Sequence, residues 1–439
     1  MKTILGFCVL LFAGSAAAES ELEFQWPNFR GPLGTGVSLH ADPPVEWAED
    51  KNIRWKMEIP GLGHSSPIVW DNQIFLTAAA PFGEPLAEPK FSGRPGAHNN
   101  LPISRHQRFF VFAVDREKGE ILWQTKVHEQ LPHEGGHETG TYASASPVTD
   151  GERVYAFFGS YGLFCLDAKS GEVIWEKDFG DQFTKHGHGE GASPALYEDK
   201  LVVNWDHEGQ SFVAAFDKNT GKQRWRTLRN EKTSWSSPIV AQHEGQPQVI
   251  VSATNAVRGY DLETGDEIWR ASGLSDNVVA SPIYSDGIVY ALSSYTFRAG
   301  FAIDLNGGAS GDLTNTERIL WRRKDRTPYI PSPVLYEGHL YYLGHYQGIL
   351  TRAVAKTGEE PSGPFRLPGL REVYASPVAA ADRLYFVDRS GITLVISNAN
   401  EPEPLSINQL DDSFSATPAL VDNELILRGE EFLYSISAK

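Results

Sequence analysis

Cysteine is nearly absent from this chain, which has two in 439 residues. Cys8 lies in an N-terminal segment typical of a signal peptide, so Cys165 would be the single cysteine of the mature chain. One cysteine excludes an internal disulfide. Cys165 lies in the apolar run 163–166, where we expect a buried, unreactive thiol.

Basic residues are also scarce, with 39 lysines and arginines against 56 aspartates and glutamates and a formal net charge of −17. An acidic surface repels phosphate backbones and anionic lipids. The composition therefore argues against nucleic acid and membrane surfaces as partners.

Long hydrophobic runs are missing. Lys2, the short apolar run 4–12 and Ala16–Ala18 predict a signal peptide over residues 1–18. No later stretch approaches the 18 or so apolar residues that a membrane span needs. Cys8 lies too far before the predicted cleavage site to resemble the lipid-attachment cysteine of a lipoprotein. We expect a periplasmic or secreted protein without a membrane anchor.

A pair made of a small hydroxyl residue and proline recurs along the whole chain. The pairs begin at Ser66, Ser146, Ser193, Ser237, Ser281, Ser332, Ser376 and Thr417. Their spacing is mostly 41–51 residues, apart from one longer first interval. This period with strand-like content predicts propeller blades of four strands each.

A second signature follows within most units. An aspartate is followed by a glycine four residues later and then by a tryptophan, as in Asp167, Gly171 and Trp175. We interpret it as the turn between third and fourth strands, with the tryptophan packed on a neighbouring blade. The prediction is an all-β fold, an eight-bladed β-propeller of four-stranded antiparallel blades.

Ring closure can be read from the two ends of the chain. Residues 433–437 form a third strand with no fourth strand after it, whereas residues 52–56 form a strand that precedes the first Ser-Pro pair. Pairing the two would leave no open edge. We therefore expect a leader over residues 19–46 and a propeller over residues 47–439.

These repeats resemble the PQQ-like repeat family of quinoprotein-type propellers. The opening segment 26–36 is similar to the one that precedes such propellers in exported proteins of planctomycete-type bacteria. The resemblance implies an eight-bladed ring and, in the dehydrogenases of the family, a quinone held over an adjacent cysteine pair and a calcium ion. With one mature cysteine that pair is impossible, so PQQ is not expected as a cofactor.

Histidines are unevenly placed in this pattern. Ten of the thirteen fall in loops on one face of the predicted ring. The densest group is His186, His188 and Glu190; in an extended loop these alternate side chains would point the same way and could bind a divalent metal. The alternative is a polar loop at the channel mouth with neutral histidines.

Other residues of that face are candidates for ligand binding. Trp235, His64 and Tyr374 hold the same position two residues before a Ser-Pro pair, where they could stack on a planar ligand or simply fill the channel. His137 and His207 are further candidates. The proline-rich segment 79–107 would be a loop over this face, either a lid or partner contact or a mobile decoration.

The sequence leaves three functions open. The first is a noncatalytic binding or scaffolding propeller with an unknown protein or small-molecule partner, favoured because no nucleophile–base motif or phosphate loop is present. The second is a metal-dependent hydrolase or lyase that uses the histidines. The third, least favoured, is a quinone-dependent dehydrogenase.

Overall fold

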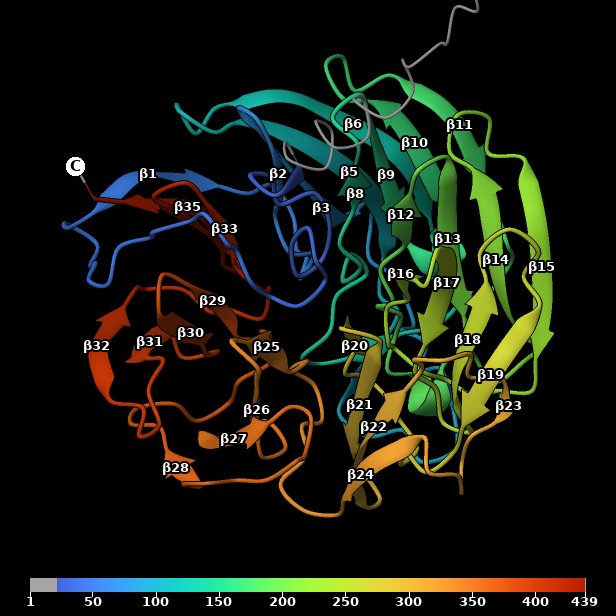
Figure 1. Cartoon of the computed structure of the whole chain (residues 1–439). Helices are drawn as coiled ribbons and strands as arrows, with labels where there is room; N and C mark the ends of the chain where they lie inside the picture. Colours follow the sequence, from blue (N-terminus) through green and yellow to red (C-terminus); the bar gives the residue numbers. More distant parts are fainter. Residues whose placement is uncertain (1–21, 439) are drawn as a thin grey trace, which may run out of the picture.

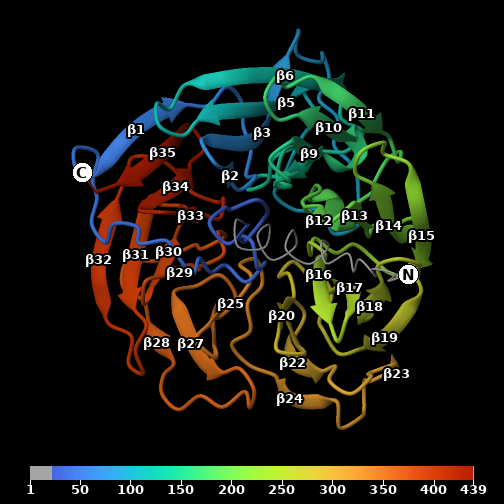
Figure 2. The same cartoon turned by 45° about the horizontal axis from the view of Figure 1, so that its top comes forward.

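The computed structural model describes residues 22–438, and the predicted signal peptide lies outside them. Eight sheets stand around a central axis in the order of the sequence, so that the ribbon passes once around the ring from blue to red (Figures 1 and 2). The expected all-β, eight-bladed propeller is confirmed.

Each blade has four antiparallel strands, numbered here from the channel outward. Blade one has β2 (Ile68–Trp70), β3 (Gln73–Phe82), β5 (His106–Asp115) and β6 (Ile121–Gln130); blade two has β8 (Val148–Thr149), β9 (Arg153–Phe157), β10 (Leu163–Asp167) and β11 (Val173–Lys177). Blade three has β12 (Ala195–Tyr197), β13 (Lys200–Trp205), β14 (Ser211–Asp217) and β15 (Gln223–Arg229). Blade four has β16 (Ile239–His243), β17 (Gln246–Val251), β18 (Val257–Asp261) and β19 (Glu267–Ala271), with the short parallel β23 (Gly311–Asp312) added outside.

Blade five has β20 (Ile283–Ser285), β21 (Ile288–Ser294), β22 (Arg298–Asp304) and β24 (Ile319–Arg323). Blade six has β25 (Val334–Tyr336), β26 (His339–Leu343), β27 (Ile349–Val354) and β28 (Phe365–Arg366); blade seven has β29 (Val378–Ala380), β30 (Arg383–Val387), β31 (Ile392–Ser397) and β32 (Pro404–Gln409). Blade eight has β33 (Ala419–Val421), β34 (Glu424–Arg428), β35 (Phe432–Ser437) and, from the start of the chain, β1 (Ile53–Glu58).

The two chain ends close the ring as the sequence predicts. β1 pairs antiparallel with β35, with Trp55 opposite Ser435 and Met57 opposite Leu433. β1 and β35 thus belong to the same blade, and β1 supplies the fourth strand that the eighth sheet would otherwise lack.

The Ser-Pro pairs also link each blade to the next. The backbone N–H of each small residue donates to the hydroxyl of the equivalent residue in the next blade, as in Ser66 to Ser146 at 2.8 Å and Ser376 to Thr417 at 3.0 Å. The eight bonds run through Ser66, Ser146, Ser193, Ser237, Ser281, Ser332, Ser376, Thr417 and back to Ser66, at 2.8–3.1 Å. A proline follows each of these residues and has no N–H of its own. We call these eight residues the hydroxyl ring.

Tryptophans of the fourth strands join the blades at the outside. The indole N–H of Trp123 donates to the Ala168 carbonyl of the next blade, and its ring lies where a side chain on Gly171 would stand. The same contact joins Trp55 to Arg116, Trp175 to Lys218, Trp225 to Leu262 and Trp321 to Ala355. Trp269 departs from the pattern and donates to Gln248 of its own blade.

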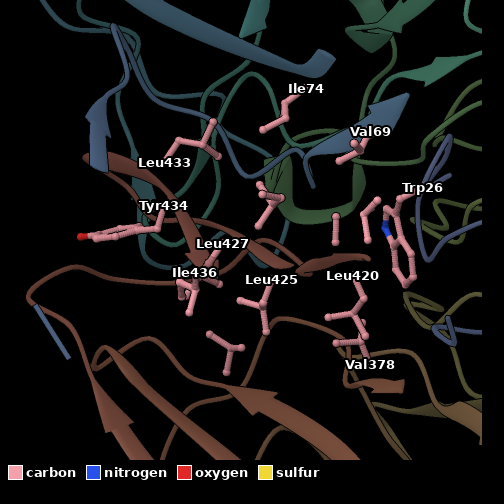
Figure 3. Packing of buried hydrophobic residues seen from close by; sticks show 14 of the residues in the cluster. Trp26, Val69, Ile74, Val378, Leu420, Leu425, Leu427, Leu433, Tyr434 and Ile436 are labelled. Atoms are coloured by element: carbon pink, nitrogen blue, oxygen red, sulfur yellow. The ribbon is translucent and has the colours of Figure 1, made fainter. Parts of the chain in front are cut away.

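The leader passes across the ring at the ends of the first strands and appears in blue near the centre of Figure 2. Trp26 forms a β-bridge with Val69 of blade one, and Val37 forms one with Ala379 of blade seven. Trp26 is fully buried beside Val69, Val378 and Leu420 (Figure 3). The leader therefore packs into the core and closes this end of the channel.

The loop between β3 and β5 of blade one is shorter than the sequence predicts. β3 and β5 pair from Gln73 opposite Asp115 to Phe82 opposite His106, so the strands absorb both ends of the predicted 79–107 loop. Residues 83–105 remain, and we call them the insert. The two-residue strand β4 (Asn100–Leu101) pairs with β7 (Gly136–His137), which fastens the insert to the loop before blade two.

Within residues 22–438, no helix has the length and apolar character needed to cross a membrane. Cys165 is buried in β10 as expected, and burial raises the pKa of its thiol to about 12.

Candidate functional site

A cavity of about 630 Å³ occupies the centre of the ring. All eight residues of the hydroxyl ring line its wall, and Phe29 of the leader lines it as well. The leader lies beyond the hydroxyl ring along the first strands, so Phe29 forms the floor. The cavity is therefore closed on the leader side and opens through the loops that lead into the first strands.

Aromatic side chains form one half of the mouth. Tyr329 stacks on His345 with ring centroids 5.0 Å apart, and Tyr295 lies 5.5 Å from Tyr329 on the other side. His345 lies 4.4 Å from Tyr346, which in turn lies 5.8 Å from Tyr374. These five rings, which we call the aromatic belt, extend over blades five to seven and all line the cavity.

Histidines form the other half, near blades one to three. His98 comes from the insert, His137 from β7, and His188 from the loop before blade three. One ring nitrogen from each lies within 4.8 Å of the other two. The rings stand edge to face, with centroids 4.7 Å apart for His98 and His188 and 4.8 Å for His137 and His188. All three line the cavity. We call them the histidine triad.

Backbone contacts hold the three segments together. The N–H of His137 donates to the His188 carbonyl at 3.2 Å, and the N–H of Glu138 donates to the Asn99 carbonyl at 2.7 Å. The side-chain amide of Asn100 donates to the carbonyls of His186 and Gly187, both at 2.8 Å. The triad is thus built from loops that fix one another.

Two imidazoles of the triad, those of His188 and His137, favour the neutral form. The pKa of His188 is lowered to about 3, chiefly by burial and further by the nearby rings of His137 and His98. Burial also lowers the pKa of His137, with a contribution from His98. Within residues 22–438, the Nε2 atom of His188 is buried without a hydrogen-bond partner. Neutral nitrogen atoms of this kind can bind metal ions.

The predicted trio of His186, His188 and Glu190 does not converge. The prediction assumed an extended loop, but residues 185–187 form a short 3-10 turn, η2 (Lys185–Gly187), in which His186 has a φ of +60°. His186 instead contacts the Pro95 carbonyl through Nδ1 at 2.9 Å. Glu190 accepts hydrogen bonds from the backbone N–H and hydroxyl of Ser160, both at 2.6 Å.

Glu190 lies between the central cavity and a second one of about 320 Å³ beneath the insert, and it lines both. Burial raises the pKa of its carboxyl to about 8, although the two bonds from Ser160 act in the opposite direction. Tyr142 and Tyr161 line the second cavity too, and burial raises the pKa of Tyr142 to about 12.

The predicted ligand-binding residues divide between the cavity and the wall. His64, His137, Trp235 and Tyr374 line the central cavity. The indole N–H of Trp235 donates to the Gly189 carbonyl at 2.7 Å, which ties it to the loop of His188. His207 does not line the cavity; its Nδ1 accepts from the N–H of Phe183 at 3.2 Å and its Nε2 lies 3.3 Å from the Gln210 carbonyl.

Comparison with known proteins identifies the family. The family model described as "Outer membrane protein assembly factor BamB" matches residues 107–361 and 210–432 in two overlapping segments, which together span well over half of the chain. The chain belongs to this family. The match supports the PQQ-like repeats that the sequence pattern indicates.

Individual relatives are distant. Outer membrane protein assembly factor BamB of Yersinia pestis is 22% identical over 68% of this chain and 82% of its own length. The 1-butanol dehydrogenase (quinone) of Thauera butanivorans is 28% identical, but over 31% of this chain and 21% of its own length.

Solved structures share the fold. A europium-containing methanol dehydrogenase has a TM-score of 0.65 at 12% identity, covering 95% of this chain and 92% of that one. BamB of Moraxella catarrhalis has a TM-score of 0.53 at 14% identity, covering 83% of this chain and 97% of that one. At these identities the likeness concerns the propeller alone.

The residues at the mouth do not fit the quinone that the dehydrogenase relatives imply. Cys165, the single cysteine after residue 8, lies inside β10 of blade two and not at the cavity. The three side chains that come together in the triad are imidazoles, whereas calcium prefers oxygen ligands. The site therefore lacks the cysteine pair of a quinone centre, and the triad does not have the ligand chemistry of a calcium site.

Proposed function

We propose that this protein is an exported binding propeller that takes a small polar ligand with a flat face into its central cavity. The observation that carries the proposal is the central cavity of about 630 Å³, closed on the leader side, with hydroxyls on its wall and aromatic rings at its mouth. Its volume falls within the range of about 300–1,000 Å³ that small-molecule sites occupy.

The two halves of the mouth suit different parts of one ligand. The aromatic belt offers ring faces for stacking, and Trp235, from the loop before blade four, lines the same cavity. The imidazoles of the triad and the carboxylates of Glu138 and Glu372 also line the mouth and can hydrogen-bond polar groups. A molecule with both a flat face and polar edges would use both halves.

Export and a protein partner remain part of this proposal. The signal-peptide pattern of residues 1–18 supports a location in the periplasm or outside the cell. Relatives named as outer membrane assembly factors support a scaffolding role with a protein partner as a second candidate, because the family model spans most of this propeller. Either role uses the ring as a rigid frame for its loops.

A thermal-shift screen of the mature protein tests the ligand proposal. Saccharides, nucleosides and PQQ would be added singly, with Tyr374→Ala as the site variant and Leu228→Ala as the control, since Leu228 is 63% exposed on an outer strand. We expect one class to raise the Tm of the parent and the control but not of Tyr374→Ala. Equal shifts in all three proteins, or none in any, would overturn the proposal.

A further inference from the structure

We propose that the histidine triad binds one divalent transition-metal ion of the zinc class, with an open coordination position that faces the central cavity. This goes beyond the proposed function, because metal binding by His98, His137 and His188 does not require the cavity ligand.

The spacing of the triad suits one ion. Zinc–nitrogen bonds of about 2.0–2.1 Å at a tetrahedral angle place the nitrogen atoms roughly 3.4 Å apart. The triad nitrogens already lie within 4.8 Å of one another. His98 is exposed and belongs to the insert, so its side chain has room to adjust when an ion binds.

In each of the three rings, one nitrogen could bind the metal or the other nitrogen has a hydrogen-bond partner that could orient the ring. The Nδ1–H of His98 donates to the Gly96 carbonyl at 2.9 Å, which leaves Nε2 unprotonated. The Nδ1 of His137 accepts from the backbone N–H of Thr139 at 3.3 Å and lies 2.8 Å from the Thr139 hydroxyl, an oxygen that could accept a proton from Nδ1 once Nε2 binds a metal. Among the described residues, the buried Nε2 of His188 has no hydrogen-bond partner. Ligating histidines commonly hold their second nitrogen in such bonds.

The charges around the triad favour a cation on balance. The carboxylates of Glu138 and Glu372 bring negative charge to His137, whereas the positive charge of Arg389 opposes them. Arg389 is itself paired with Glu372, with Nη1 and Oε2 3.4 Å apart. Glu138 and Glu372 line the same cavity, and the whole chain carries −17.

Three protein ligands leave a fourth position open, which is the arrangement of catalytic rather than structural zinc sites. All three histidines line the central cavity, so this position is open to solvent and to any cavity ligand. A carboxylate or hydroxyl oxygen of that ligand is the group we expect there. This last step rests on the proposed function, whereas the metal site does not.

Calorimetric titration of the tag-free mature protein with Zn²⁺ alone tests the site. We expect one equivalent to bind, and Co²⁺ in its place to give the visible absorption bands of a four-coordinate ion. His98→Ala, His137→Ala and His188→Ala should each weaken Zn²⁺ binding more than the about 10–100-fold that loss of an outer-shell partner costs. His339→Ala is the control, because His339 begins β26 on another blade and contacts the Glu337 carbonyl.

The outcomes separate the two proposals. Less than a tenth of an equivalent of bound Zn²⁺, or equal affinity in the His188→Ala and His339→Ala proteins, would overturn the metal site. A circular-dichroism spectrum and Tm for each variant show whether it is folded, and His98→Ala alters an exposed side chain that the fold does not need. A failed ligand screen with intact Zn²⁺ binding would overturn the proposed function alone.

Discussion

The backbone N–H of Thr417 donates to the hydroxyl of Ser66 at 3.1 Å, although 351 residues separate the two in the chain. This bond completes the hydroxyl ring, and it lies where blade eight meets blade one. The same junction is tied at the outside by Trp55, whose indole N–H donates to the Arg116 carbonyl at 2.8 Å. Inner and outer contacts therefore both close the propeller.

Replacing Ser66 by alanine should destabilise the fold. The substitution removes the acceptor of the Thr417 N–H in a buried position, which costs about 1–3 kcal/mol. Ser66→Thr keeps the hydroxyl, as Thr417 does naturally, and should retain most of the stability. Denaturant unfolding measures both variants, and an unchanged unfolding free energy for Ser66→Ala would contradict a stabilising ring.

Gly119→Ala should destabilise the protein more than Gly83→Ala. The two glycines have nearly the same φ, +69° and +71°, so both variants bear a similar backbone strain of about 1–2 kcal/mol. A methyl group on Gly119 would stand 2.5 Å from the Trp55 ring, whereas nothing lies within 4 Å of one on Gly83. The difference in Tm between the two variants measures how tightly Trp55 packs against Gly119. Equal Tm values would contradict this packing.

Arg94→Ala should loosen the insert. The Nε–H of Arg94 donates to Glu134 at 2.6 Å, and the guanidinium lies 4.2 Å from the centre of the Phe183 ring. Glu134 is buried, so losing its partner leaves an uncompensated charge. We expect proteolysis within residues 83–105 to become at least about tenfold faster.

Lys90→Ala is the control for that experiment. Lys90 is exposed in the same insert, and its backbone alone bridges to Ile103. Equal cleavage of the two variants would show that Arg94 does not fasten the insert.

His64 should make the fold sensitive to acid. Burial lowers its pKa to about 3 in the folded protein, and the positive charges of Arg428 and Arg389 add to the effect. Because the folded pKa lies below the ordinary value of about 6.5, this contribution to stability is complete above pH 6.5 and is lost as the pH falls toward 3. The Tm of His64→Gln should therefore fall less between pH 7 and pH 4 than that of the parent. Parallel curves would contradict the assignment.

The blade count and the ring closure could be predicted because each unit carries its own local pattern. Strands such as β9 and β10 follow from apolar runs, and the turn after Asp167 follows from its glycine, whose φ is +71°. The hydrogen bonds of the hydroxyl ring were not predicted, because seven of them join residues 41–80 positions apart and the eighth joins residues 351 positions apart. Their signal was nevertheless present: every small residue of the Ser-Pro pairs is a serine or threonine.

The sequence pointed to only part of the cluster that His98, His137 and His188 form. The sequence analysis proposes His188 as a metal ligand and His137 as a ligand-binding residue, and both remain predictions. It does not single out His98, because nothing in residues 83–105 shows where the insert folds back. The position of the insert is fixed by the β4–β7 pairing and by the hydrogen bonds of Asn100. These contacts involve the loops before blades two and three, which lie far from the insert in the sequence. The error at Glu190 came from assuming an extended backbone where a turn at His186 reverses it.

A crystal of the mature protein soaked in Zn²⁺ tests most directly whether the mouth of the channel is a metal site. Anomalous scattering measured at the zinc absorption edge locates the ion. We expect one strong peak bonded to nitrogen atoms of His98, His137 and His188 beside the central cavity. Peaks confined to surface carboxylates, with none at the triad, would contradict it.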